Sequence, residues 1–354
     1  MIVIDGSYGE GGGQVLRTSL TLSALLGEPV RIENVRAKRR KPGLQAQHFT
    51  GVRAIAQICD AELEGAELDS LTLTFRPLAS PRAGEYSFDV AEARKGGSAG
   101  ATSLVFQTLL LPLALAPGQS RLTMRGGTHV AWSPPFHYLK HVYLPTLARM
   151  GLEARAEIEK WGWYPIGGGE MTALIRDRRE SYLSGLDLVE RGELKRLWGI
   201  SATSNLPAHI GQRQKKRAEE HLRRCGFDPQ IEIIDAPSPG QGTTVFLVAD
   251  YEHAVAGFSS LGERGKPAEK VAEEACREFI AYHQSGACLD KHLADQLILP
   301  IALASGPSAF TTCEITMHSL TNVWVVEQFL GVRFEIEGEE GEKGRVQKMA
   351  GSDA

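Results

Sequence analysis

The sequence has no long uninterrupted run of apolar residues. Its longest apolar stretch, TSLVFQTLLLPLALA at residues 102–116, is broken by Gln107 and Pro112 and has the length of a buried core helix. A membrane-spanning helix needs about 20 consecutive apolar residues, so we expect no membrane-spanning segment. A content of 42% hydrophobic and 23% charged residues is ordinary for a soluble globular protein, and 354 residues allow roughly two domains.

The chain also lacks a strong excess of either charge. Its formal net charge of -4 gives no general attraction to nucleic acid, so a basic binding site has to be local. Closely spaced cysteines are absent too: the five cysteines lie far apart, without the spacing of a zinc site. We interpret them as reduced thiols. The start MIVIDGS has no basic region or cleavage site, and we expect a cytoplasmic protein, or a nuclear one if the source is eukaryotic.

Three stretches of the chain repeat one order of elements. Each reads as a loop, an apolar helix, a strand, an amphipathic helix and a strand, and the helices end at Gly, as helices often do. The three apolar helices are QVLRTSLTLSALLG, ATSLVFQTLLLPLALAPG and LADQLILPIALASG. This order predicts an α+β fold with three repeated βαβαβ-type units.

A segment with an order of its own interrupts the repeat. Residues 185–283 read as a strand, a basic helix, a strand, a turn, two strands and a helix. We therefore predict a large domain of residues 1–184 and 284–338, with a smaller α/β domain of residues 185–283 inserted into its third unit. Residues 339–354 form a polar, Gly-rich tail, and we expect its end to be disordered.

Between the first strand and the first helix, five glycines surround one acidic residue, Glu10, in IDGSYGEGGGQ. Glycines there allow a sharp turn or a close backbone approach. The spacing matches neither G-x-G-x-x-G nor G-x-x-x-x-G-K-[ST], so neither standard phosphate loop is present. Because a carboxylate repels phosphate unless a cation lies between them, we interpret Glu10 as a ligand of a divalent metal that holds phosphate oxygens. The alternative is a carboxylate that caps the helix.

A second candidate is the basic stretch VRAKRRKPGLQAQH, residues 35–48. Its run of Arg and Lys at residues 36–41 precedes a helix start, and guanidinium groups beside a helix N-terminus form an anion site. Gln47 and His48, one turn into that helix, favour a function over the alternative of a solvated charged loop. The other basic run, residues 213–224, contains interspersed glutamates and predicts a solvated helix surface.

Polar residues in otherwise apolar segments complete the candidate set. Asp295 and Gln296 occupy the first turn of an apolar helix, where Asp is also a common cap. Gln107 lies inside the apolar helix of the second unit, and a buried amide needs a partner. His318 lies at a helix start, where free N–H groups would keep the imidazole neutral and nucleophilic near pH 7. The alternative is a structural or exposed histidine.

Taken together, these motifs resemble the RNA 3'-terminal phosphate cyclase family. The stretches that carry the resemblance are DGSYGEGGGQVLR, VRAKRRKPGLQAQH, TSLVFQTLLLP, GGTHVAWSPPFHY, GWYPIGGGEM, HLADQLILP and MHSLTNVWVVEQF. They follow the family's order from residue 5 to about residue 334, whereas any one of them alone would be unspecific. The resemblance implies three units similar to the carboxy-terminal domain of a bacterial translation initiation factor, plus a smaller inserted domain.

The family's activity implies an ATP-dependent conversion of an RNA 3'-phosphate end to a 2',3'-cyclic phosphate. His318 would attack the α-phosphate of ATP, releasing pyrophosphate and forming a histidyl–AMP. AMP would pass to the RNA 3'-phosphate, and the neighbouring 2'-hydroxyl would then displace it. The expected partners are ATP, RNA with a 3'-phosphate end and a divalent metal, Mg²⁺ or Mn²⁺. The sequence predicts no membrane partner and no particular oligomeric state.

The resemblance also assigns roles residue by residue. His318 corresponds to the nucleophile, and Glu10 and Asp295 correspond to the acids associated with the metal. The AMP pocket corresponds to Gln107, Pro134, Tyr138, His292, Leu293, Ala294, Asp295 and Gln296. The RNA phosphate end and the ATP phosphates correspond to Arg17, Arg36, Arg39, Gln47 and His48. Some relatives carry tyrosine at the place of His292, and an imidazole stacks on adenine more weakly.

Two other classes of protein are built from similar units. Cyclase-like proteins of ribosome assembly bind RNA or protein partners without catalysis and lack the nucleophilic histidine, so His318 argues against that class. An enolpyruvyl transferase would carry pairs of Lys and Arg for a small anionic substrate and would not need ATP. Labelling of the protein by ATP separates the three classes.

Overall fold

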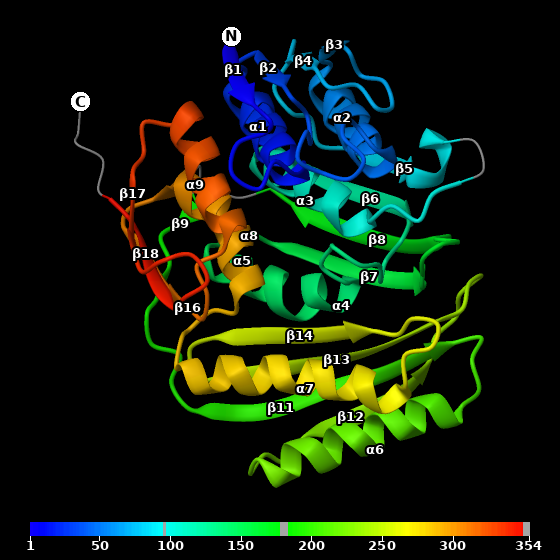
Figure 1. The fold of residues 1–354 in the computed structure, drawn as a ribbon. Coiled ribbons are helices and arrows are strands. Elements are labelled where there is room, and N and C mark those ends of the chain that lie inside the picture. The colour runs from blue at the N-terminus through cyan, green and yellow to red at the C-terminus, as the bar shows by residue number, and fades with distance from the viewer. Residues whose placement is uncertain (95–96, 178–182, 350–354) are drawn as a thin grey trace.

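Mixed β-sheets with helices packed on them form the protein (Figure 1). The computed structural model describes residues 1–94, 97–177 and 183–349. Within these residues, the chain forms four four-stranded sheets and one two-stranded sheet. This mixture of helices and mixed sheets agrees with the predicted α+β class.

The first sheet contains residues 2–76 and the helices between its strands. In chain order its elements are β1 (Ile2–Asp5), α1 (Gly13–Leu26), β2 (Val30–Glu33), α2 (Ala46–Cys59), β3 (Glu62–Glu64) and β4 (Leu73–Arg76). The strand order is β1-β2-β4-β3. Strands β1 and β2 are parallel, and the other two pairs are antiparallel.

The second sheet contains residues 85–176. Its strands are β5 (Glu85–Asp89), β6 (Gln119–Gly126), β7 (Ala154–Lys160) and β8 (Gly169–Arg176), and a short 3₁₀ turn (Val90–Ala93) follows β5. Helix α3 (Thr102–Leu115) precedes β6, and the segment after β6 consists of α4 (Phe136–Tyr138), a π-helical stretch (Leu139–Tyr143) and α5 (Leu144–Arg149). The π-helical stretch ends two residues before Pro145, whose missing N–H prevents an ordinary α-helical bond to the carbonyl of His141.

The third sheet joins residues on both sides of a long intervening segment. Its strands are β10 (Asp187–Leu188), β16 (Ser308–Thr312), β17 (Phe334–Glu337) and β18 (Gly344–Lys348), with helices α8 (Lys291–Leu303) and α9 (Met317–Phe329). Beside it, β9 (Leu183–Ser184) pairs with β15 (Ala304–Ser305). The third sheet has the order β10-β16-β18-β17 and the second has the order β5-β6-β8-β7. Both share the pairing pattern of the first sheet: one parallel pair followed by two antiparallel pairs.

A fourth sheet is formed by the segment between β10 and α8. Its elements are β11 (Leu194–Ser204), α6 (His209–Arg224), β12 (Gln230–Asp235), β13 (Gly242–Tyr251), β14 (Val255–Leu261) and α7 (Ala268–Ser285). The strand order is β12-β11-β13-β14, and α6 and α7 lie side by side on it (Figure 1). Ion pairs of α6 with α7, such as Arg213 with Glu269 at 2.7 Å, occupy part of the basic run.

Two assignments made from the sequence differ from the structure at the ends of segments. Residues 187–188, which the sequence placed in the insertion, form β10 and pair with β16. Residues 344–348, which the sequence placed in the polar tail, form β18 between β16 and β17. Strand β18 forms because Val346, only 1% exposed, points into the core, while its neighbours Arg345 and Gln347 are half-buried. The end of the tail lies outside the described residues.

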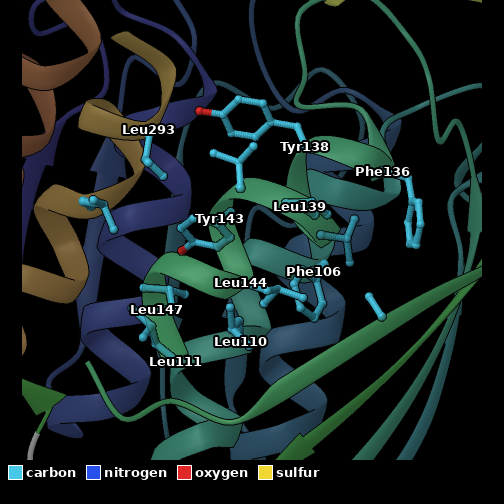
Figure 2. Packing of buried hydrophobic residues seen from close by; sticks show 14 of the residues in the cluster. Phe106, Leu110, Leu111, Phe136, Tyr138, Leu139, Tyr143, Leu144, Leu147 and Leu293 are labelled. Carbon is cyan, nitrogen blue, oxygen red and sulfur yellow. The ribbon is translucent and has the colours of Figure 1, made fainter. Parts of the chain in front are cut away.

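Helix α3 lies at the centre of the core, as its apolar composition predicts. Helices α1 and α2 and strands β6 and β8 contact it, which explains why apolar residues surround its axis. Figure 2 shows Phe106 and Leu110 of α3 packed beside the segment that contains Leu139 and Leu144. Pro112 cannot donate to the Thr108 carbonyl, which instead accepts a 3.0 Å hydrogen bond from another helix, from the Thr21 hydroxyl of α1.

Among the helices that the structure describes, none is both long enough and apolar enough to cross a membrane.

Candidate active site

The glycine-rich loop between β1 and α1 lies against helix α9. The Tyr8 ring stacks on Trp324, with ring centroids 3.9 Å apart and an interplanar angle of 14°. The N–H of Glu10 donates to the Thr321 hydroxyl at 3.4 Å. A Cβ on Gly9 would lie 2.2 Å from that hydroxyl oxygen, so only glycine allows this approach. The loop thereby brings Glu10 to the start of α9.

The Glu10 carboxylate lies between an imidazole and a guanidinium group. Its Oε2 contacts Nδ1 of His318, and its Oε1 contacts the guanidinium of Arg39. The side chain is 12% exposed, and among the described residues no further group donates a hydrogen bond to its oxygens. The N-cap of α1 is Gly12, so the alternative that Glu10 caps this helix is wrong. A Cβ on Gly12 would lie 2.0 Å from Oε1, which shows why glycine is needed beside the carboxylate.

His318 is the second residue of α9, and its side chain is 47% exposed. Partial burial lowers its pKa, as do the charges of Arg17 and Arg39, while the carboxylate of Asp295 opposes them. The imidazole is therefore neutral near pH 7. Since Nδ1 faces the Glu10 carboxylate, the ring proton belongs on Nδ1, and Nε2 retains a free lone pair.

Asp295 joins helix α8 to the start of α9. The Ser319 hydroxyl donates to its Oδ1 at 2.6 Å, and the Thr316 hydroxyl donates to the same oxygen. The Asn322 side-chain amide donates to the Asp295 backbone carbonyl at 2.9 Å. Burial raises the pKa of Asp295, and the two hydroxyl hydrogen bonds oppose that rise. Asp295 thus fixes the helix start that carries His318.

The donor set suits a metal that is held in part by a substrate. The part of the chain that the structure describes contains no group of three or more His, Cys, Asp or Glu side chains suited to a metal ion. Mg²⁺ is commonly bound by one or two carboxylates, with phosphate and water oxygens completing its shell. Glu10, with its nearly buried carboxylate, fits such a ligand. Asp295 has Oδ1 engaged by two hydroxyls.

Arg17 belongs to a polar network between α1 and α9. Its guanidinium donates to Oε1 of Gln14, and the Gln14 amide donates to Oδ1 of Asn322 at 2.9 Å. The Thr18 hydroxyl donates to the same Asn322 oxygen at 2.7 Å. Burial lowers the pKa of Arg17 to about 10, which leaves it cationic near pH 7. The network therefore holds a positive charge near His318.

His48 lies beneath the first turn of α1. Its Nδ1 accepts from the Gln45 N–H at 3.3 Å, and a Cβ on Gly13 would lie 2.4 Å from its Nε2. Burial lowers the pKa of His48 well below its ordinary value, and the charges of Arg36 and Arg17 lower it further. His48 is consequently a neutral hydrogen-bonding group, not a cation for phosphate.

In the basic loop before α2, some of the cationic side chains donate hydrogen bonds to backbone carbonyls of the protein. Arg36 has a left-handed backbone with φ of 54° and donates to the carbonyls of Lys41 and Gly43, both at 2.8 Å. Lys38 donates to the Gly9 carbonyl at 2.9 Å and so joins this loop to the glycine-rich loop. The structure thus brings Arg39 to Glu10, whereas Arg36 is engaged by backbone carbonyls.

The half-buried amide of Gln107 has the partner that the sequence requires. Its Nε2 donates to Oε1 of Gln296, whose own amide donates to the His292 carbonyl at 2.7 Å. The His292 side chain is exposed, whereas Leu293 and Ala294 are buried. The structure thus brings the Gln107 amide of α3 to the first turn of α8. Because the Leu293 and Ala294 side chains are buried, these two residues present only backbone groups to a ligand.

Tyr138 is the last residue of α4 and contacts the start of α8. Figure 2 shows its hydroxyl directed toward the turn of α8 that carries Leu293, and it donates to Oδ1 of Asp290 at 2.7 Å. The same Oδ1 accepts from the His292 and Leu293 N–H groups at 3.0 Å and caps α8. Burial raises the pKa of Tyr138 well above its ordinary value, and Asp290 adds to the rise. Pro134, four residues earlier, is half-buried.

Gln47 connects the first and second units. Its Oε1 accepts from the N–H of Ala101, the residue before α3, at 2.9 Å. A water-sized cavity beside it is lined by the side chains of Arg17 and His48 together with aliphatic residues of α1, α2 and α3.

Sequence reasoning missed several members of these networks. Asp290 directly precedes a helix, which is the position of an N-cap, and this pattern identifies it. Asn322 lies four residues after His318 in an otherwise apolar helix, so its periodicity places it on the same face. Gln14 and Thr18 have the same spacing in α1. Thr316 is the N-cap of α9, a position that the same pattern identifies, whereas no short motif marks Ser319, whose bond to Asp295 comes from the packing of α8 on α9.

Comparison with known proteins gives one consistent result. The family model for RNA 3'-terminal phosphate cyclase matches residues 8–336. The RNA 3'-terminal phosphate cyclase of Methylococcus capsulatus is 52% identical over 338 residues, which cover 95% of this chain and 93% of the relative. That of Pyrobaculum neutrophilum is 46% identical over 337 residues, 94% of each chain. A solved enolpyruvyl transferase, NikO from Streptomyces tendae, aligns with a TM-score of 0.29 and 16% identity over 51% of this chain and 33% of that one.

Proposed function

The chain belongs to the RNA 3'-terminal phosphate cyclase family, and from this premise we propose that it uses ATP to convert RNA 3'-phosphate ends into 2',3'-cyclic phosphates through a histidyl–AMP intermediate. The observation that supports the covalent route best is the contact between the Glu10 carboxylate and Nδ1 of His318. A neutral imidazole held at Nδ1 is a nucleophile at Nε2.

In the first step, Nε2 of His318 attacks the α-phosphorus of ATP. A P–N bond forms, the bond to the pyrophosphate oxygen breaks, and pyrophosphate leaves. Glu10 holds the Nδ1 proton and stabilises the positive charge that the ring gains. Arg17 and Arg39 lie near the imidazole and neutralise the phosphate charge. A divalent metal held by Glu10 would supply Lewis-acid stabilisation of the phosphate oxygens.

In the second step, an oxygen of the RNA 3'-phosphate attacks the phosphorus of the histidyl–AMP. The P–N bond breaks, His318 is regenerated, and an RNA–adenylate anhydride forms. In the third step, the adjacent 2'-oxygen attacks the 3'-phosphorus, loses its proton, and displaces AMP. We assign the terminal phosphate to the positive charges of Arg17 and Arg39, with Gln47 and His48 as neutral hydrogen-bonding groups beside them.

We assign the adenosine to the junction of α3, α4 and α8. The amides of Gln107 and Gln296 and the exposed ring of His292 are the polar and stacking groups there. Tyr138 acts on this pocket indirectly, because its hydroxyl is engaged by the cap of α8. Leu293 and Ala294 contribute backbone alone, since their side chains are buried.

We also infer that residues 1–184 and 284–338 form three related units, because their sheets have the same strand order. The β11 to α7 segment lies between β10 and α8, which supports a domain inserted into the third unit. We propose that the protein acts in the cytoplasm on cellular RNA, because relatives named RNA 3'-terminal phosphate cyclase come from bacteria and archaea.

The direct test is incubation with Mg²⁺ and ATP labelled at the α-phosphate, followed by denaturing electrophoresis. The wild type should acquire an acid-labile, alkali-stable label, and His318→Ala should acquire none. The wild type should then convert a 3'-phosphorylated oligoribonucleotide to a cyclic end. Absence of label on the wild type would refute the covalent route, and the non-catalytic class would become the better description.

A further inference from the structure

Two neighbouring loops of the second unit present large apolar side chains to solvent. Trp132 lies on the loop between β6 and α4, while Tyr164 and Ile166 lie on the loop between β7 and β8. Their exposed fractions are 97%, 77% and 56%. Isolated exposed apolar residues are ordinary, but here three of them lie on two joined loops.

Backbone hydrogen bonds hold the two loops side by side. The N–H groups of Thr128 and His129 both donate to the Gly162 carbonyl, at 3.0 and 3.1 Å. The Gly162 N–H donates in return to the Thr128 hydroxyl at 2.9 Å, and His129 pairs with Trp163 in a short parallel bridge. The two loops therefore form one surface.

Buried rings make this surface rigid. His129 stacks on Trp161 with centroids 4.0 Å apart and an interplanar angle of 12°, and its Nε2 bonds Nδ1 of His137 at 2.9 Å. Three residues after His129, Trp132 has a left-handed backbone, with φ of 65°. That conformation costs roughly 1 to 3 kcal/mol for a bulky residue and persists where surroundings enforce it, often at binding sites. The backbone of the loop therefore places the indole of Trp132 in solvent.

Both loops connect directly to the active site. The first begins beside Gly127, which pairs with Ala101, and the Ala101 N–H donates to Gln47. The second loop packs its Gly167 against Ser98 and Ala99 in the same stretch before α3. Two residues after Trp132 the chain reaches Pro134, and it then enters α4, which carries Tyr138. The surface thus adjoins both the residues proposed to bind the RNA phosphate and the proposed adenosine pocket.

We propose that Trp132 and Tyr164 form a stacking platform for the unpaired nucleobases that precede the 3'-phosphate of the RNA substrate, an inference that rests on the proposed function. Aromatic side chains bind single strands with little sequence preference, because every base has a π-face. That property suits an enzyme which reads an end and not a sequence. A net charge of -4 gives the chain no general attraction to RNA, so local stacking supplies affinity upstream of the phosphate site.

The test compares two 3'-phosphorylated hexaribonucleotides, one intact and one with abasic residues at the positions upstream of the terminal nucleotide. The two have the same backbone charge and differ in stacking bases. For the intact strand, Trp132→Ala and Tyr164→Ala should each raise KM by roughly 5- to 150-fold, and Trp132→Phe should retain most of the affinity. For the abasic strand, the KM of the wild type should already be high, and the alanine variants should not raise this KM further.

Leu78→Ala provides the matched control, because Leu78 is an exposed apolar residue of the first unit, 61% exposed. It should leave KM for both strands unchanged. Labelling by ATP alone reports on the proposed function, since that step needs no RNA. If the wild type is labelled and cyclises RNA but the alanine variants bind both strands as the wild type does, the platform is refuted. A change of oligomeric state by light scattering without a change in KM would also refute it and would identify a contact between copies.

Discussion

At the residue scale, Glu10 contacts two groups that the reaction would use. Its carboxylate meets the imidazole of His318 on one side and the guanidinium of Arg39 on the other. The glycines beside it leave no room for a Cβ, so the position of the carboxylate depends on the backbone of the loop. A change at Glu10 therefore affects both the orientation of the nucleophile and the charge around the phosphates.

Replacing Glu10 by glutamine removes the charge and keeps the shape of the side chain. We expect the rate of protein adenylylation to fall by about 100-fold, and the concentration of Mg²⁺ needed for half-maximal rate to rise. Chelation with EDTA should abolish labelling of the wild type, and Mg²⁺ or Mn²⁺ should restore it. Glu33→Gln, at an exposed glutamate of β2, is the control and should behave as the wild type. An unchanged metal requirement in Glu10→Gln would contradict a role of Glu10 as metal ligand.

The pH dependence of adenylylation follows from the protonation of His318. Its pKa is lowered from the ordinary value of 6.5, so the neutral, nucleophilic form persists at neutral pH and is lost only in acid. The rate should therefore be constant above about pH 6.5 and decline at lower pH. Because the Asp295 charge raises the pKa of His318, Asp295→Asn should move the acid limb to still lower pH. Single-turnover labelling across pH measures the acid limb of the wild type and of Asp295→Asn. An acid limb at higher pH in Asp295→Asn would contradict the assigned effect of the Asp295 charge on His318.

At the element scale, the buried histidines beneath the two loops are sensitive to acid. Burial lowers the pKa of His129 well below its ordinary value and lowers the pKa of His137 to about 3. Both histidines are neutral in the folded protein at pH values where they would be protonated in the unfolded chain. The contribution of the two histidines to the free energy of unfolding is therefore fully present above about pH 6.5 and is lost as the pH drops toward about 3.

We expect the free energy of unfolding to decrease between about pH 7.5 and about pH 5.5 by roughly 1 kcal/mol for each of the two histidines. Urea denaturation at the two pH values measures this decrease. In His137→Gln, the decrease in the free energy of unfolding between the two pH values should be smaller by roughly 1 kcal/mol. His209→Gln, at an exposed histidine, should retain the full dependence. Equal pH dependence in the two variants would contradict the role of His137.

The sequence correctly predicted the elements that have a strong hydrophobic pattern. It did not predict the strand and the polar networks that form through tertiary contacts. Helix α3 was predicted as a buried helix because its apolar run is unbroken by charge, and the partner required by Gln107 is present as Gln296. Strand β18 was missed because one buried valine in a polar segment gives no clear alternation. The networks around Asn322 and Asp290 join elements distant in the chain, and sequence spacing shows only which helix face each residue occupies.

At the scale of the whole molecule, a backbone group of the fourth sheet contacts the cap of α8, beside the proposed adenosine pocket. The N–H of Gly257 in β14 donates to Oδ2 of Asp290 at 3.3 Å, and Oδ1 of the same side chain holds Tyr138 and the start of α8. Three parts of the protein thus meet at Asp290. The position of β14 therefore bears on the geometry of the pocket.

Gly257→Ala tests this connection. A Cβ there would lie 2.7 Å from Val142 and 2.9 Å from Tyr138, so the sheet or the α4 segment must shift. We expect KM for ATP in the labelling reaction to rise, and the free energy of unfolding to fall by roughly 1 to 3 kcal/mol, as overpacking costs. Gly331→Ala is the control, because its Cβ would meet nothing within 4 Å. A Gly257→Ala variant with unchanged KM for ATP would show that the pocket does not depend on β14.

The third sheet has a consequence for the order in which the protein is synthesised. Its first strand, β10, precedes the whole fourth sheet in the chain, whereas β18, which separates β16 from β17, comes last. A ribosome therefore makes the glycine-rich loop early and His318 late, and the third sheet stays incomplete until β18 has emerged. A translation product that stops short of α9 has the arginines proposed to bind phosphate but lacks the proposed nucleophile, so an interrupted chain cannot consume ATP by the proposed route.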